Sequence, residues 1–257
     1  MTDSMLTSEM EPKYPRELNV DKMRTCLHVL KTSFDKEREI LRRTDEILSS
    51  SFNVFDYIVD RRSEKGELML SNVLAMILRA DGDHGQGEAF QKLFFKAVKD
   101  LCDVDTTDGG AGLLSCPDSG YQVLIEETIG GLNNVNGELQ KGRMDISLHH
   151  PNEWIIGIEN KPFAGDQPKQ IERYLDDMAR RAGAGHGLVY LSGTGQSPQE
   201  HSISGHKLTC ANDSGKFCVF SYKSDLVPFL QQCSQICRSP RFSNFLDDFS
   251  VYVLHCF

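Results

Sequence analysis

Two short stretches decide the fold of this chain, Gly142–Leu148 (GRMDISL) and Trp154–Lys161 (WIIGIENK). In the first, apolar and polar residues alternate, which is the period of a strand with one buried face. In the second, an apolar run ends abruptly in Glu-Asn-Lys, as expected of a central strand that is covered on both faces and stops at a polar edge. The sequence between them, HHPNE, favours a turn, so the two stretches are predicted to form a β-hairpin.

Such a hairpin brings three charged groups together. Glu159 and Lys161 are two residues apart and leave the same face of their strand, whereas Asn160 points the other way. The pairing sets Asp145 near Glu159, at the end of two adjacent strands. Two close carboxylates repel each other unless a cation lies between them, and their oxygens suit Mg²⁺ or Mn²⁺. A lysine beside them can orient or deprotonate a water molecule, or offset charge on a phosphate under attack.

The three residues alone also allow a plainer interpretation. Aspartate, then thirteen residues, then Glu-x-Lys occurs by chance in many proteins of this size. An exposed strand end with a surface ion pair would have the same sequence motif without any catalytic function. The choice between the two interpretations therefore rests on the rest of the chain.

Length and composition allow one α/β domain, and the sequence has no stretch that suits a membrane span. The 257 residues suffice for one sizeable domain with a helical extension. No apolar run reaches the roughly 20 residues of a transmembrane helix, and Met1–Lys13 lacks the apolar core of a signal peptide. The eight cysteines form no CxxC pair, so free thiols in a reducing cytoplasm are expected.

The charge balance argues against tight, non-specific DNA binding. The chain has 28 basic and 37 acidic residues, a formal net charge of −9. Proteins that grip a phosphate backbone usually present a basic face. An acidic total still permits a local basic site, and a bound metal ion adds positive charge of its own.

Three segments follow from the pattern along the chain. Residues 1–19 are expected to be a disordered lead. Residues 20–60 form an N-terminal helical segment, in which apolar residues recur at helical spacing in one long helix or two. This segment suits packing on the domain or on a second copy of the chain, so a homodimer is a candidate assembly. Residues 61–257 form the α/β domain.

Within that domain, helices are predicted over 68–79, 88–101 and 241–257, and strands over 121–129, 188–192 and 217–222. Glu67 opens the first helix, where the helix dipole favours a carboxylate with or without a role in chemistry. Glu126 and Glu127 face opposite sides of their strand, so one of them can approach Asp145. Asp166 is predicted to cap the helix that follows it.

Taken together, these motifs resemble the PD-(D/E)xK nuclease superfamily, and within it a stand-alone bacterial family. The matching pieces are Glu67-x3-Ser71, the HGxGxxF motif from His84, GRMDI from Gly142, IENKx3GDQx2Qx3Y from Ile158 and LVYL from Leu188. The resemblance runs from about residue 50 to the end of the chain. One departure is Leu70, where the family often has histidine.

The resemblance implies an α/β, restriction-endonuclease-like fold: a mixed β-sheet core flanked by helices, with an N-terminal helical extension. It also implies a Mg²⁺-dependent (or Mn²⁺-dependent) nuclease acting on nucleic acid, most plausibly DNA, in defence or DNA processing. Asp145 and Glu159 would bind the metal with the backbone carbonyl of Asn160, and Lys161 would position or activate the attacking water. Glu67 would be a further ligand or would orient the lysine. Of the two glutamates at 126 and 127, Glu127 would be the one to approach the metal. Other residues would contact the substrate or support the ligands: Glu127, Gln167, Gln170, Tyr174 and Arg143.

A second hypothesis is a catalytically silent protein that keeps the nuclease fold and acts as a binding or assembly module. The acidic charge favours it. The presence of Asp145, Glu159 and Lys161 together disfavours it, because a decayed site would be expected to lose at least one of them.

Overall fold

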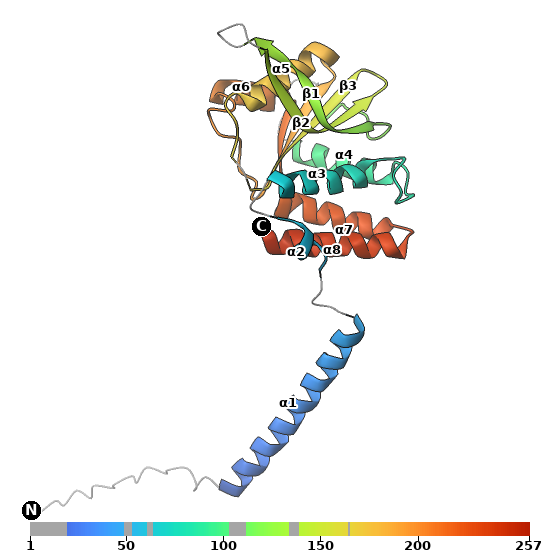
Figure 1. Cartoon of the computed structure of the whole chain (residues 1–257), viewed down its shortest axis with the longest axis vertical. Coiled ribbons are helices and arrows are strands. Elements are labelled where there is room, and N and C mark those ends of the chain that lie inside the picture. The colour runs from blue at the N-terminus through green and yellow to red at the C-terminus, as the bar shows by residue number, and fades with distance from the viewer. Residues whose placement is uncertain (1–19, 49–52, 61–63, 103–111, 134–138, 164) are drawn as a thin grey trace, which may run out of the picture. The chain divides into compact units, whose positions relative to one another are not determined.

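The computed structural model describes residues 20–48, 53–60, 64–102, 112–133, 139–163 and 165–257 (Figure 1). The chain divides into two units, 1–52 and 53–257. The predicted disordered lead, residues 1–19, lies outside the described residues. In the first unit, α1 (Val20–Leu48) is one continuous helix rather than two. Glu39 pairs on its surface with Arg42 and Arg43, one turn further along.

The second unit is built on one five-stranded sheet in the order β1-β2-β3-β4-β5. The strands are β1 (Gln122–Asn133), β2 (Leu139–His150), β3 (Trp154–Lys161), β4 (His186–Ser192) and β5 (Phe217–Ser221). The pairs β1–β2 and β2–β3 are antiparallel, whereas β3–β4 and β4–β5 are parallel. The predicted hairpin is confirmed, with Ile146 opposite Ile158 and His150 opposite Trp154.

Helices cover both faces of this sheet, which is why β3 and β4 are apolar on both sides. On one face lie α3 (Glu64–Leu78), α4 (Ala89–Cys102) and α7 (Val227–Ile236), with α8 (Pro240–Cys256) packed beside α7. On the other face lie α5 (Gln170–Ala182) and α6 (Gly205–Asp213). The predicted fold class, a mixed sheet flanked by helices with an N-terminal helical extension, is confirmed.

The short helix α2 (Phe55–Ile58) packs within the second unit. The ring of Phe55 lies 4.9 Å from that of Phe249 on α8, and Asn53 Nδ2 donates a 2.6 Å hydrogen bond to the carbonyl oxygen of Asp248. Residues 53–60, which the sequence pattern grouped with the N-terminal helical segment, therefore pack with the α/β domain.

The length of β1 and the segment after β5 both differ from the prediction. β1 continues to Asn133 rather than ending at residue 129, because it keeps pairing with the first half of β2. Between β5 and α7 the chain forms a five-residue π-helix, η1 (Tyr222–Leu226). The turn is fixed locally, since Ser221 N donates to Asp225 Oδ2 over 2.7 Å and Ser224 N donates to Ser221 Oγ. π-Helical turns often mark functional sites.

No helix in the described parts of the chain combines the length and apolar character needed to cross a bilayer.

Candidate active site

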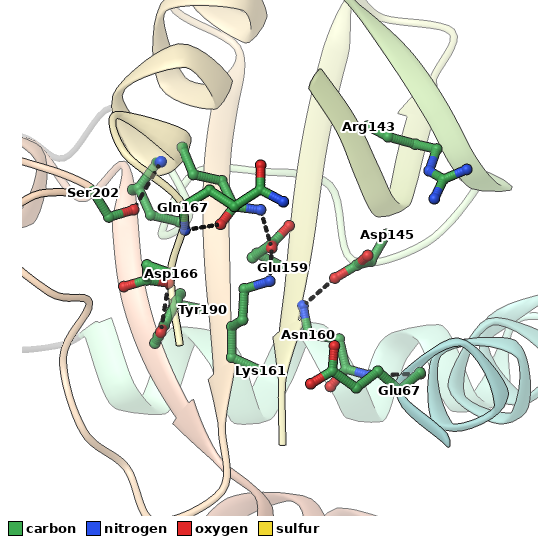
Figure 2. A network of polar contacts seen from close by, with 12 residues as sticks. Glu67, Arg143, Asp145, Glu159, Asn160, Lys161, Asp166, Gln167, Tyr190 and Ser202 are labelled. Atoms are coloured by element: carbon green, nitrogen blue, oxygen red, sulfur yellow. Dashed lines mark hydrogen bonds and ion pairs between the residues drawn. The ribbon is translucent and has the colours of Figure 1, made fainter. Parts of the chain in front are cut away.

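The middle of β2 and the end of β3 bring Asp145, Glu159 and Lys161 together, beside the last pair of the predicted hairpin, Ile146–Ile158 (Figure 2). Lys161 Nζ lies 2.8 Å from Glu159 Oε1. The backbone N–H of Asn160 donates a 2.7 Å hydrogen bond to Asp145 Oδ2. Two carboxylates and one ammonium therefore lie together where the pairing of β2 with β3 stops.

An irregularity in the β1–β2 ladder lies at Asp145. Regular alternation would put Met144 and Ile146 on the same face, yet Met144 packs in the core under α5 and Ile146 in the core under α3. Across from Asp145, Glu126 has a φ of 51°, the left-handed region. The pairs on either side are Ile125–Ile146 and Glu127–Met144. Such local disruptions re-aim a side chain, and they are frequent beside active sites.

The side chain of Asn160 joins β3 to two other elements. Its Nδ2 donates to Ser71 Oγ over 2.9 Å and to the Glu67 carbonyl oxygen over 3.2 Å, both on α3. Its Oδ1 accepts a 2.7 Å hydrogen bond from Tyr222 Oη on η1. Sequence reasoning gave Asn160 only a backbone role and missed Tyr222, because no local pattern links residues so far apart in the chain.

Glu159 is fully buried, and its two carboxylate oxygens differ in their hydrogen-bond partners. Oε1 accepts from Gln170 Nε2 over 2.7 Å and pairs with Lys161. Oε2 has no hydrogen-bond partner in the described part of the chain. An unsatisfied buried acceptor costs about 1–3 kcal/mol, and more when it is charged, so this atom is suited to a cation.

Gln170 and Tyr174 on α5 support Glu159 from behind. Gln170 Nε2 also donates to Tyr174 Oη over 3.0 Å, and Tyr174 Oη donates to the Arg143 carbonyl oxygen over 2.7 Å. Both side chains are buried, so they hold the site together rather than meet a phosphate backbone. Gln167 takes part through its backbone N–H, which donates to Gln170 Oε1 over 3.0 Å, while its side chain is exposed.

Burial makes the two carboxylates hard to ionise together. It raises the pKa of Asp145 to about 6, against the opposing effects of the Asn160 N–H and Lys161. Burial and the charge of Asp145 raise the pKa of Glu159 well above its ordinary value. Burial alone would lower the pKa of Lys161, but Glu159 and Asp145 outweigh it and raise that pKa. Lys161 is therefore a cation at neutral pH.

The two glutamates of β1 lie in different surroundings. Glu127, preferred from the sequence, accepts hydrogen bonds from Ser147 Oγ over 2.6 Å and from Arg181 over 2.7 Å, in a network that faces α5. Glu126 is the one whose charge raises the pKa of Asp145. Its carboxylate lies 3.1 Å from the exposed guanidinium of Arg143. The left-handed backbone at Glu126 breaks the alternation on which the sequence argument relied.

Glu67 lies where the sequence predicted, whereas Asp166 does not have its predicted role. Glu67 projects from α3 beside Asn160, and its charge raises the pKa of Asp145 (Figure 2). Asp166 does not cap α5: the residue before that helix is Lys169, with φ 54°. The Asp166 carboxylate instead accepts hydrogen bonds from Tyr190 Oη over 2.9 Å and from the Gln199 N–H over 2.7 Å.

The donor set fits a hard divalent cation. Asp145 and Glu159 offer carboxylate oxygens, one of them the unsatisfied Oε2, and oxygen is the ligand that Mg²⁺ and Mn²⁺ prefer. Among the described residues, no three His, Cys, Asp or Glu side chains converge as metal ligands. Mg²⁺ is commonly bound by one or two carboxylates and keeps several waters, so two suffice.

Comparison with known proteins found one match. The family model described as "PD-(D/E)XK nuclease superfamily" matches residues 52–250. A search of curated proteins and a search of solved structures found none. The matched range includes every side chain described above around Asp145 and Glu159, and it leaves out α1.

Proposed function

We propose, on the premise that this chain belongs to the PD-(D/E)XK nuclease superfamily, that it is a divalent-metal-dependent nuclease that hydrolyses phosphodiester bonds. The observation that carries the proposal is the buried, unsatisfied Glu159 Oε2 beside Asp145 and Lys161. A purely structural ion pair has no need of a second carboxylate whose ionisation burial opposes.

Asp145 and Glu159 would hold Mg²⁺ or Mn²⁺, with the Asn160 carbonyl as a further ligand and Glu67 adding negative charge nearby. When bound, such an ion neutralises charge on a phosphate and lowers the pKa of coordinated water. The Asn160 N–H keeps Asp145 in position, and Gln170 keeps Glu159 in position. Their pre-set geometry spares the site from reorganising when substrate binds.

Lys161 supplies a fixed positive charge. Its raised pKa favours orienting the attacking water and offsetting charge on the non-bridging oxygens over removing a proton from that water. Hydrolysis adds the water oxygen to phosphorus and breaks the bond to the leaving oxygen, which gives a phosphate monoester and a hydroxyl. The exposed Arg143 is placed to contact a neighbouring phosphate.

DNA is the proposed substrate, in the cytoplasm, in DNA processing or defence. All eight cysteines are free, which is consistent with a reducing compartment. With a net charge of −9, affinity should come from the site and its metal rather than from a broad basic surface.

The test is cleavage of labelled single-stranded DNA, duplex DNA and RNA in Mg²⁺, Mn²⁺ or EDTA. Lys161→Met removes the charge and keeps the length of the side chain, whereas Lys207→Met removes a surface lysine that pairs with Glu172. We expect metal-dependent cleavage that falls about 100-fold or more in Lys161→Met and stays within about two-fold of wild type in Lys207→Met.

The acidic net charge favours one alternative, a silent binding or assembly module. Thermal melting with Mn²⁺ separates the two functions. A nuclease should be stabilised by Mn²⁺, and Asp145→Asn combined with Glu159→Gln should abolish that stabilisation. Failure to cut any substrate, with no Mn²⁺-dependent rise in the melting temperature, would leave the binding module as the function.

We further propose that α1 joins two copies of the chain. Apolar residues recur every seven positions along α1, at Val20, Leu27, Phe34, Leu41 and Leu48. Two further apolar residues, Met23 and Leu30, follow Val20 and Leu27 by three positions. This is the a/d pattern of a coiled coil. Leu27, Phe34 and Leu41 are 61–66% exposed, and a lone helix cannot bury its own stripe.

Light scattering after gel filtration tests this assembly. Wild type should elute as a dimer, and Leu27→Arg with Phe34→Arg should be monomeric. His28→Arg with Asp35→Arg adds the same side chains one residue away, off the stripe, and should remain dimeric. A monomeric wild type would refute the dimer and leave the nuclease proposal untouched.

A further inference from the structure

A pocket of about 190 Å³ opens beside Lys161, on the far side from Asp145. The ends of β3 and β4 and the segments that follow them form its wall. The lining residues that matter here are Lys161, Phe163, Asp166, Gln196, Gln199 and Phe257. Neither Asp145 nor Glu159 belongs to the lining, so the pocket touches the reaction centre through Lys161.

The carboxylate of Asp166 disfavours a phosphate at the side of the pocket away from Lys161. Asp166 is fixed there by the buried Tyr190, whose Oη donates to its Oδ1, and by the Gln199 N–H, which donates to its Oδ2. A carboxylate has about four acceptor positions, so two remain for a ligand. A fixed anion repels phosphate groups and favours a neutral ligand with N–H donors.

One wall offers a flat aromatic surface. The ring of Phe163, 37% exposed, stacks on that of Phe257 at 5.3 Å and an interplanar angle of 17°. Phe257 in turn lies against the buried Tyr222, with ring centroids 4.5 Å apart. An exposed ring braced in this way is a platform for stacking another ring.

Amide groups complete the lining. The side chains of Gln196 and Gln199 are exposed at the rim, and the backbone around them is held by the Gln196 N–H, which donates to Ser192 Oγ over 2.8 Å. An amide can donate and accept, so it can pair with the edge of any base. At 190 Å³ the pocket is smaller than the roughly 300–1,000 Å³ of drug-sized sites, which leaves room for a single ring system.

We propose that this pocket receives one unstacked nucleobase of the strand being cut, next to the phosphate held at Lys161. The base stacks on Phe163 and donates an amino hydrogen bond to Asp166. A base inside a duplex cannot enter, so the protein prefers single-stranded or locally unpaired nucleic acid. This inference rests on the proposed nuclease function.

The first experiment compares binding without cleavage. An Asp145→Asn background is titrated in EDTA with fluorescent single-stranded and duplex 12-mers. In that background, Phe163→Leu should weaken single-strand binding about five- to 100-fold, the effect of losing one base–aromatic stack, and change duplex binding little. Phe163→Tyr keeps the ring and should restore binding. Tyr57→Leu removes an exposed aromatic outside the pocket and should have no effect.

The second experiment locates the base directly. A single-stranded oligonucleotide carrying 5-iodocytosine, which keeps the exocyclic amino group, should crosslink to Phe163 or Phe257 when the complex is irradiated. Asp166→Asn should lower the affinity for cytosine- and adenine-containing oligonucleotides more than for oligothymidine, because thymine lacks an exocyclic amino group.

The outcomes separate the two proposals. If wild type cuts nucleic acid but Phe163→Leu keeps the single-strand preference, or the crosslink falls outside the pocket, the base pocket is wrong and the nuclease stands. If wild type neither binds nor cuts nucleic acid, both fail. Melting temperatures close to wild type show that the Phe163 and Asp166 variants are folded.

Discussion

The backbone N–H of Asn160 donates to Oδ2 of Asp145 over 2.7 Å. The strand that carries Glu159, β3, therefore also fixes the carboxylate of Asp145 on the neighbouring strand, β2. One hydrogen bond leaves the other lone pairs of Asp145 available to a cation. Because an asparagine at position 145 can accept the same bond, exchanging Asp145 for asparagine removes the charge while keeping the link between β2 and β3.

That exchange should change how stability depends on pH. Burial raises the pKa of Asp145 from 3.8 to about 6, so between these values the folded state binds more protons than the unfolded state. The contribution of Asp145 to stability is therefore lost as pH rises through this window. Relative to wild type, Asp145→Asn should gain up to about 3 kcal/mol in the free energy of unfolding between pH 4 and pH 7, without metal. Urea unfolding in EDTA at four pH values measures this, and a constant difference would contradict it.

Gln170 should matter for catalysis although it is buried beneath the site. Gln170→Leu removes the 2.7 Å hydrogen bond to Glu159 and leaves its Oε1 to Lys161 alone. Loss of a group that orients a metal ligand typically costs about 10- to 100-fold in activity or metal affinity, and we expect a loss in that range in kcat. Gln231→Leu, an exposed position on α7, is the matched control. Equal activity of both variants would show that Glu159 holds its position without Gln170.

Ser71 and Tyr222 should be energetically coupled through Asn160. The side-chain amide of Asn160 donates to Ser71 Oγ over 2.9 Å and accepts from Tyr222 Oη over 2.7 Å. Ser71→Ala and Tyr222→Phe should each lower the free energy of unfolding by about 1–2 kcal/mol, and the double variant should lose less than the sum. A double-mutant cycle by urea unfolding measures the coupling. Tyr57→Phe, at an exposed tyrosine, is the control: it measures how much the loss of a tyrosine hydroxyl changes the free energy of unfolding outside this network. Strict additivity would mean that Asn160 does not link the two.

Glutamine at position 127 should change the stability of the fold, whereas glutamine at position 126 should change metal binding. Burial would raise the pKa of Glu127, but Arg181, Ser147 and His149 outweigh it and lower that pKa. Its stabilising effect is therefore present at neutral pH and lost as pH falls through the folded pKa. Glu127→Gln should lower the urea midpoint at pH 7 and leave the Mn²⁺-induced shift in melting temperature intact.

Glu126→Gln should act in the opposite way. It removes a charge that raises the pKa of Asp145, so Mn²⁺ stabilisation should persist to lower pH than in wild type. The urea midpoint at pH 7 should change little, because the Glu126–Arg143 pair is largely solvated. If instead Glu127→Gln abolished the Mn²⁺ effect, the assignment of the two glutamates would be reversed.

The sequence predicted what depends on neighbours in the chain. The hairpin, the meeting of Asp145, Glu159 and Lys161, and the opposite direction of Asn160 all follow from period-two strands and one short turn. The sheet flanked by helices follows in the same way, because β3 and β4 are apolar on both sides.

The failures have specific physical causes. The alternation of Glu126 and Glu127 assumed a regular strand, and the left-handed backbone at Glu126 breaks that assumption. Asp166 has the sequence signature of a helix cap, but β4 and the following segment compete for its carboxylate. Tyr222 could not be found, since it reaches Asn160 through a π-helical turn 62 residues later. These are tertiary effects, and local propensity carries no record of them.

The amide of Asn160 joins Ser71, which precedes it by 89 residues, to Tyr222, which follows it by 62. During synthesis on the ribosome, β2 and β3 therefore emerge well before the tyrosine that completes their support. Contacts of such long sequence separation form late, because a long loop must close first. The hydrogen-bond network around Asn160 is therefore completed only when most of the chain has been translated.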